Sequence, residues 1–201
     1  MADLERLEAL SKTISNPYEP QYRVRWLAVT EYARRIRELD ENENLDTLPE
    51  VIRLYGQHLK TRFLGVLTDP SECPELRQHI LHLIVGNSLR AFSRIDEKVK
   101  NSAGSIKLPF NLGWPDLSAT IKENFSFEPM FDAMIAVAEN PEERDLMRSH
   151  AVISFHQAFK LAGKVLDQPG NNDNFSARFL HRAMQSSNPE LRNHALTLGN
   201  P

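Results

Sequence analysis

The sequence predicts an all-α protein, and three observations lead to that fold class. Apolar residues recur every three or four positions over long stretches, as in helices with one buried face. Short segments rich in Asn, Asp and Pro separate these stretches. No stretch alternates apolar and polar residues, which is the pattern of a half-buried strand. We therefore expect about seven or eight helices packed as one compact, irregular bundle.

The N-terminal part of the chain contains three amphipathic stretches. Residues 2–14 and 22–39 each carry apolar side chains at helical spacing. The third stretch begins at Leu48 and continues to Leu67, which is long enough for about five turns. Each of these stretches predicts a helix with one face against the core.

Two further stretches, residues 76–99 and 142–166, are apolar on most sides, so we expect them to be the central helices of the bundle. Shorter helices are expected at 128–139, 175–186 and 189–198. Three helix starts follow one scheme, in which an Asp or Asn cap precedes a proline and an acidic residue enters the first turn. The three sites are Asp69-Pro70, Asn140-Pro141 and Asn188-Pro189.

Two connections interrupt the helical pattern within what we expect to be a single domain spanning residues 1–201. Residues 168–174 read QPGNNDN and predict a polar loop. Residues 101–115 read NSAGSIKLPFNLGWP, an apolar loop containing glycine and proline. Its apolar side chains either fold onto the core or remain available to a partner.

A short motif recurs along the chain. Residues 74–83 read PELRQHILHL and residues 189–198 read PELRNHALTL, identical at seven of ten positions, and residues 147–152 keep the Arg-x-His step. The motif resembles the second helix of HEAT-type repeats, which implies a short α-solenoid of helix pairs as the alternative architecture. The copies are unevenly spaced, at Arg77, Arg148 and Arg192, whereas solenoids keep a fixed period. We assign no family from it.

The composition indicates which cellular compartment and which classes of partner suit the protein. The 201 residues carry a net charge of −3, which gives no global attraction to nucleic acid or anionic lipid. The single cysteine, Cys73, excludes an intramolecular disulfide and favours a reducing compartment. There is no secretory signal and no apolar run of about 18 residues, so we expect no membrane association. We predict a cytoplasmic protein, or one in a host cytosol if it is exported without a signal.

Catalytic motifs are missing, which favours a protein that is not an enzyme and carries no cofactor. The sequence has no nucleophile elbow, phosphate-binding glycine loop or paired-cysteine metal motif. His79 and His82 share a predicted helix face with Glu75, so a metal-dependent enzyme built on them is the second alternative function. We predict no metal site, because a further histidine would have to converge on this pair.

The leading functional prediction is a non-enzymatic helical module for protein interaction or assembly. Phe110, Leu112 and Trp114 of the apolar loop are the predicted partner-binding residues, because aromatic anchors carry much of the energy of an interface. The apolar arc over residues 22–36 is a second surface, suited to packing against another copy. The first alternative is a nucleic-acid-binding subunit that uses arginine-rich helix faces. Its predicted contacts are Arg23, Arg34, Arg37, Arg90 and Arg94.

Overall fold

The computed structural model describes residues 2–18, 21–41, 48–86, 127–166 and 175–199. Within these ranges the secondary structure is helical, without strands, so the all-α fold class is confirmed. The predicted loops at 101–115 and 168–174 lie outside the described residues. The elements are α1 (Ala2–Ile14), α2 (Tyr22–Glu41), α3 (Leu48–His58), η1 (Leu59–Phe63), α4 (Leu64–Thr68), α5 (Pro74–His79), η2 (Ile80–Gly86), α8 (Phe127–Glu139), α9 (Asp145–Leu166), α10 (Phe175–Met184) and α11 (Pro189–Gly199).

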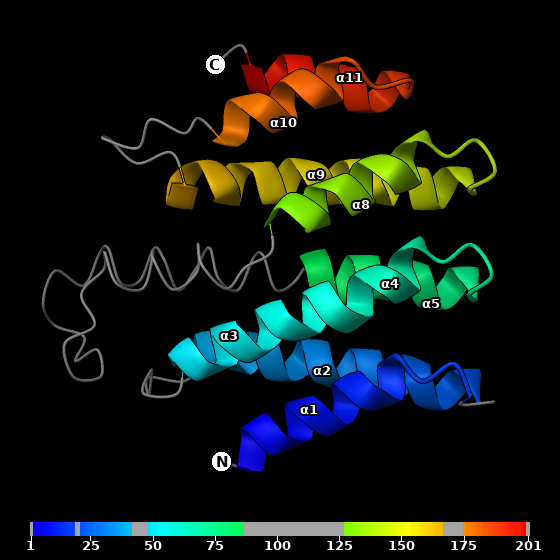
Figure 1. Cartoon of the computed structure of the whole chain (residues 1–201), viewed down its shortest axis with the longest axis vertical. Coiled ribbons are helices and arrows are strands. Elements are labelled where there is room, and N and C mark those ends of the chain that lie inside the picture. The colour runs from blue at the N-terminus through cyan, green and yellow to red at the C-terminus, as the bar shows by residue number, and fades with distance from the viewer. Residues whose placement is uncertain (1, 19–20, 42–47, 87–126, 167–174, 200–201) are drawn as a thin grey trace, which may run out of the picture.

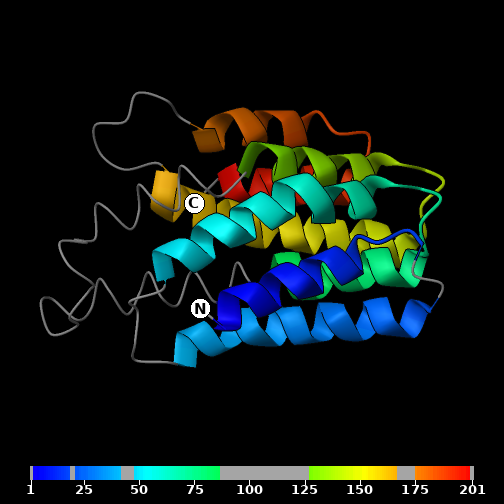
Figure 2. The ribbon, with the colours of Figure 1, turned by 60° about the horizontal axis from the view of Figure 1, so that its bottom comes forward.

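The described helices form four antiparallel pairs stacked along the long axis (Figure 1). The pairs are α1 with α2, α3–η1–α4 with α5–η2, α8 with α9, and α10 with α11. Figure 2 shows the first helices of the pairs in one layer and the second helices in another. Each pair packs on its neighbours in the stack, with α1 and α11 at opposite ends. The predicted bundle is thus ordered as stacked helix pairs, which is the arrangement named in the alternative architecture.

The buried core residues are those that the apolar periodicity of the sequence places on one face of each helix. In α2 the buried side chains recur at steps of three and four, and the same holds in α9. The largest fully buried side chains are aromatic and come from several pairs: Tyr32, Tyr55, Phe63, Phe131 and Phe155. Phe131 and Phe155 meet edge to face, with ring centroids 5.2 Å apart. Burial is one-sided in α9, where Ile153 is 46% exposed. The second-helix layer therefore presents an open face.

The helix-start prediction is right at one of its three sites. Asn188 caps α11, because its Oδ1 accepts from the amides of Glu190 (2.9 Å) and Leu191 (3.1 Å). At Asp69 and Asn140 the side-chain oxygen instead accepts from the amide two residues on, at 2.9 and 3.0 Å. These are Asx turns within the hairpins, and the helices begin later, at Pro74 and Asp145. The prediction failed there because a short Asx side chain stabilises either structure.

Two helices contain a π-helical segment. The long helix of the second pair widens from α3 through η1 before it resumes as α4, and α5 widens into η2. Wide turns of this kind interrupt the regular ladder and are frequent at functional sites. Here η1 packs against α1, while η2 packs against α2 and α9. Both segments therefore lie where neighbouring pairs meet.

Candidate functional site

Four arginines of the second helices reach back to the hairpin turns, which gather along one side of the stack (Figure 2). The Nε of Arg25 donates to the carbonyl of Ile14 (2.9 Å), that of Arg77 to Leu67 (2.8 Å) and that of Arg148 to Ala138 (3.1 Å). The guanidinium of Arg192 donates to the carbonyls of Ser186 and Ser187. Carbonyls at the ends of first helices lack intrahelical partners. Each arginine therefore closes its own hairpin.

Two of these arginines, Arg25 and Arg77, also join one pair to the next. The guanidinium of Arg25 makes two parallel bonds to Glu72 of the following turn, at 2.9 and 2.6 Å. The guanidinium of Arg77 lies 2.5 Å from Glu143 of the turn after that, and both side chains are at least nine-tenths buried. Between the third and fourth pairs, the side-chain Nδ2 of Asn188 donates to the Ala138 carbonyl (2.6 Å), which also accepts from Arg148. We call this row of contacts the turn edge.

Histidines lie at the contacts between neighbouring second helices, and we call these contacts seams. In the first seam the ring of His79 stacks on Trp26 of α2, with centroids 4.2 Å apart and planes 6° apart. Its Nε2 lies 2.9 Å from the hydroxyl oxygen of Thr30, whose own proton is directed to the Trp26 carbonyl. Because that hydroxyl is already a donor, His79 donates from Nε2, which is the neutral ring's common tautomer.

The second and third seams repeat the scheme. His150 of α9 faces His82 of η2 with ring centroids 5.7 Å apart, and the Gln78 amide lies 3.4 Å from its Nδ1. In the third seam His194 of α11 meets His156 of α9 at 5.3 Å between centroids and 83° between planes. Their Nδ1 atoms are 3.4 Å apart.

Partial burial lowers the pKa of three seam histidines. Desolvation is the main cause for His79, His150 and His156, because it disfavours the charged ring. The charge of His82 adds to the lowering of the pKa at His79 and His150. The charges of Lys160 and His194 do the same at His156. In the folded chain the neutral form is therefore favoured for His79, His150 and His156.

The Arg-x-His motif now has a structural meaning. Two residues along a helix point about 200° apart, so the arginine and the histidine face different sides. The arginine turns to the hairpin, while the histidine turns to the preceding second helix. His79 contacts Trp26 and Thr30, which follow Arg25 by one and five residues. His150 contacts Gln78 and His82, which follow Arg77 by the same two steps. The first pair carries the arginine as Arg25 without a histidine two positions on, so the sequence motif did not reveal it.

Exposed apolar side chains gather where α2 begins. Among the described residues eight large hydrophobic side chains are exposed, and five of them lie within residues 18–27. We call these five the aromatic patch: Tyr18, Tyr22, Val24, Trp26 and Leu27. Tyr18 is 88% exposed and Leu27 is 59% exposed, although both could gain by burial. Tyr22 and Trp26 share one side of α2, whereas Leu27 and Val24 lie about 140° and about 200° round the helix from Tyr22, so the aromatic patch surrounds the start of α2. Clusters of exposed apolar side chains are typical of contact surfaces.

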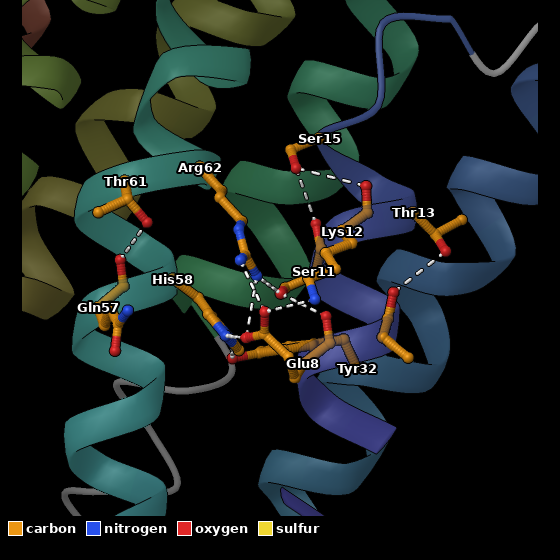
Figure 3. Close-up of polar contacts among 11 residues, drawn as sticks. Glu8, Ser11, Lys12, Thr13, Ser15, Tyr32, Gln57, His58, Thr61 and Arg62 are labelled. Carbon is orange, nitrogen blue, oxygen red and sulfur yellow. Dashed lines mark hydrogen bonds and ion pairs between the residues drawn. The ribbon is translucent and has the colours of Figure 1, made fainter. Parts of the chain in front are cut away.

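A polar network lies in the first-helix layer, between α1, α2 and η1 (Figure 3). His58 is fully buried: its Nε2 donates to Glu8 at 2.6 Å and its Nδ1 accepts from the Tyr32 hydroxyl at 3.0 Å. The guanidinium of Arg62 makes two bonds to Glu8, at 3.1 and 2.8 Å, and a further one to Ser11. Bonds from Arg62 and His58 hold the pKa of Glu8 well below its usual range. Burial lowers the pKa of His58, so the pair is an anion beside a neutral ring.

This network joins three helices and leaves little free for chemistry. Both nitrogens of His58 and both oxygens of Glu8 are engaged within it. A base with no exposed nitrogen cannot reach a substrate in this conformation. The one signal in the sequence was Arg62, which falls between Val51 and Tyr55 on the apolar stripe of residues 48–67, whereas His58 lies at the border of that stripe.

Of the predicted partner-binding and nucleic-acid-binding residues, only the three arginines of α2 lie within the described ranges. Phe110, Leu112, Trp114, Arg90 and Arg94 lie outside the described residues. Arg23 and Arg37 are exposed on α2. Arg34 lies between them but is ion-paired with Glu31 (2.7 Å) and with Glu38. That pairing raises its pKa further above the usual value and neutralises much of the charge that a phosphate would meet.

His79 and His82 turn to different neighbours. The ring of His79 packs on α2, whereas that of His82 faces His150 on α9. Glu75, the third member of the predicted cluster, pairs with Arg144 at 2.7 Å and accepts from the thiol of Cys73. Across the described residues, no group of three or more His, Cys, Asp or Glu side chains is arranged to hold a metal ion.

Among the helices described, none is both long enough and apolar enough to span a bilayer. No protein-family model, curated protein or solved structure matches the chain.

Proposed function

We propose that the protein is a non-enzymatic helical scaffold that binds protein through the aromatic patch at the start of α2. The observation that carries the proposal is the concentration of exposed apolar side chains there. Tyr22 and Trp26 are four residues apart and share one side of α2, and the exposed Tyr18 precedes them in the turn. Aromatic side chains are the residue type that interfaces favour, because they bury a large area with few rotatable bonds.

The surroundings of the patch support a rigid contact surface. Arg25 lies among the patch residues and is itself buried, bonded both to its own hairpin and to Glu72. Trp26 is held by its stack on His79. Side chains ordered before binding lose less entropy when a partner docks. The partner we expect is a protein segment with apolar side chains that cover Tyr18 and Leu27.

A nucleic-acid-binding subunit remains the alternative, and it has a different signature. Arg23 and Arg37 are its exposed cations on α2, but the ion pairs of Arg34 divide them. Binding to phosphates would weaken steeply as salt rises, whereas contact through apolar rings would not. Titration of labelled single-stranded RNA and DNA at low and moderate salt separates the two functions.

The test places a photo-crosslinking residue at Leu27 in cells that make the protein, and a matched probe at Ile153. Both side chains are exposed and apolar, but Ile153 lies on α9, outside the patch. We expect a discrete crosslinked species from position 27 that is lost when Tyr18→Asp is added. The purified chain is also weighed in solution at two concentrations, to identify a second copy as the occupant. Equal crosslinking at both positions, or none at position 27 in a chain that stays monomeric, would contradict the proposal.

A further inference from the structure

Two hairpin turns carry a glutamate at the same position of the repeated helix pair. Glu72 and Glu143 each lie five residues before the arginine of their own pair. Glu72 accepts two bonds from Arg25 of the preceding pair, and Glu143 likewise pairs with Arg77. The two glutamate side chains are only 15% and 7% exposed. A carboxylate at this position therefore links each of these pairs to the one before it.

The fourth turn carries a serine at this position instead. Ser187 lies five residues before Arg192 and is exposed. Arg148, the arginine of the preceding pair, has Asp145 as its acidic partner, at 3.6 Å on the same helix, and that carboxylate is fully exposed. Exposed pairs of this kind contribute little to stability. Within the described residues, the junction of the third and fourth pairs thus lacks the buried arginine–carboxylate contact that the turn edge has at the other two junctions.

The structure also brings Ser187 close to Arg148. The side chains of Asn188 and Arg148 donate to the same Ala138 carbonyl, at 2.6 and 3.1 Å, so the guanidinium lies beside the residue that follows Ser187. Asn188 also caps α11, which fixes the turn on the helix. The serine is therefore held near the guanidinium while it stays open to solvent.

The charges around Ser187 are two cations and one carboxylate. The Ser187 carbonyl accepts from Arg192 (3.0 Å), and its amide donates to Glu139 (3.2 Å). Arg148 is the second cation. A phosphate on the serine adds about −1.5 to −2 charges near pH 7 and three acceptor oxygens, and guanidinium groups bind phosphate through paired bonds. We expect the two arginines to outweigh the repulsion by Glu139.

We propose that Ser187 is a phosphorylation site whose phosphate pairs with Arg148 and completes the turn edge. A protein kinase supplies the reaction: the Ser187 Oγ forms a bond to the γ-phosphorus of ATP, the bond to the β,γ-bridging oxygen breaks, ADP leaves, and the hydroxyl proton passes to the catalytic aspartate of the kinase. The modification fastens the last helix pair, which the neutral side chain of Asn188 joins to the third pair at the turn edge of the unmodified chain. The site is independent of the aromatic patch, which belongs to the first pair.

The test compares the full chain with and without phosphoserine incorporated at position 187 during translation. Amide exchange reports the opening of the last pair, which lies at the end of the stack. We expect the phosphate to slow exchange in α10 and α11 by at least about tenfold, or 1.4 kcal/mol, and to leave α1 unchanged. In the Arg148→Gln background the same phosphate should slow exchange by less than about twofold. Because each background has its own unmodified reference, a loss of stability from Arg148→Gln itself does not enter the comparison.

Phosphoserine at position 71 is the matched control. Ser71 is an exposed serine of the second turn, one position before Glu72, and its hydroxyl donates to Asp69 (2.6 Å). A phosphate there meets carboxylates, so it should not slow exchange. Glu139→Gln removes the opposing charge at the fourth turn and should increase the slowing caused by the phosphate on Ser187 by about twofold or more. Equal slowing from positions 71 and 187, or slowing that persists in Arg148→Gln, would overturn the pairing.

Occupancy is tested on protein isolated, with phosphatases inhibited, from the cells that make it. Mass spectrometry should find a phosphate on the peptide that contains Ser187, and Ser187→Ala should remove it. The variant separates Ser187 from its neighbour Ser186, which is buried. A chain without phosphate in every growth phase, or with phosphate on Ser186 alone, would overturn the site.

Discussion

The turn edge and the histidine seams use the same second helices for opposite purposes. At the turn edge, Arg25 and Arg77 are almost fully buried and carry permanent charges against Glu72 and Glu143. In the seams, rings such as His79 and His150 are half-buried and neutral. Within one helix, an arginine such as Arg77 makes a contact of permanent charge, and the histidine two residues later makes a contact that responds to pH. The comparison shows how the same second helices carry permanent charges along the turn side of the stack and titratable rings across the open face.

The largest effect is expected from breaking the turn edge at its most buried pair. Arg77→Ala leaves the carboxylate of Glu143 buried without its cation and removes the bond to the Leu67 carbonyl. A buried charge left alone costs about 3–5 kcal/mol, so we expect a loss of that size in the free energy of unfolding, measured with urea.

Two controls belong with this variant. Replacing Arg77 and Glu143 together by Met and Leu should restore most of the stability, since no charge is then left unpaired. Arg182→Ala breaks the exposed pair with Asp132 and should cost less than about 1 kcal/mol. Equal losses from Arg77→Ala and Arg182→Ala would show that the buried pair at the turn edge contributes no more stability than an exposed ion pair.

A smaller loss is expected in the first-helix layer. Glu8→Gln removes the charge that accepts from Arg62, His58 and Lys12, and bonds to charged groups contribute about 1.5–3 kcal/mol. Because α1 is at the end of the stack, the loss should appear as faster amide exchange in that helix first. Glu5→Gln, an exposed position on the same helix, should leave exchange unchanged. Uniformly faster exchange would mean that the network stabilises the whole chain rather than this junction.

Helical periodicity was enough to predict the fold class and the three N-terminal helices, because the side chains that face the core are set by spacing within each helix. The helix starts at Asp69 and Asn140 were wrong, because an Asx turn and a cap use the same oxygen and amides. The Arg-x-His motif was visible, but its role was not. That role depends on which second helix lies beside which, as when His150 meets His82. His58 was missed because its partners are Glu8 and Tyr32, distant in sequence.

The seams predict a pH dependence that the turn edge lacks. The pKa values of His79 and His150 are lowered in the folded chain, mainly by burial, while the unfolded rings take up protons near pH 6.5. As pH falls through 6.5, the unfolded chain binds more protons and the free energy of unfolding decreases. Above pH 6.5 the contribution of the seams is complete. At the turn edge, burial raises the pKa of Glu72, but the bonds from Arg25 and the Cys73 amide outweigh burial, so the pKa is lowered away from this range.

The measurement is a urea series from pH 7.5 to about pH 5.5 on wild type and on the double variant His79→Gln, His150→Gln. Glutamine keeps a polar group in each seam without a titrating ring. The wild type should lose stability more steeply than the variant over this interval. His58 and His156 also have pKa values lowered by burial, so a residual slope in the variant is expected from these two rings. Identical slopes in the two proteins would exclude the first and second seams as the source of the pH dependence.

The smallest effect is expected at Gly65, and it has the opposite sign. This glycine lies in α4, and a methyl group placed on it would meet no atom within 4 Å. Gly65→Ala should therefore add about 0.5–1 kcal/mol to the free energy of unfolding, because glycine loses more backbone freedom than alanine in a helix. The helix that it stiffens ends beside the Leu67 carbonyl, the acceptor of Arg77. If α4 is already rigid up to the turn edge, the gain should be equal in the wild type and in Arg77→Ala. A larger gain in Arg77→Ala would show instead that the arginine orders the end of α4, and that the turn edge acts on the first helix as well as between pairs.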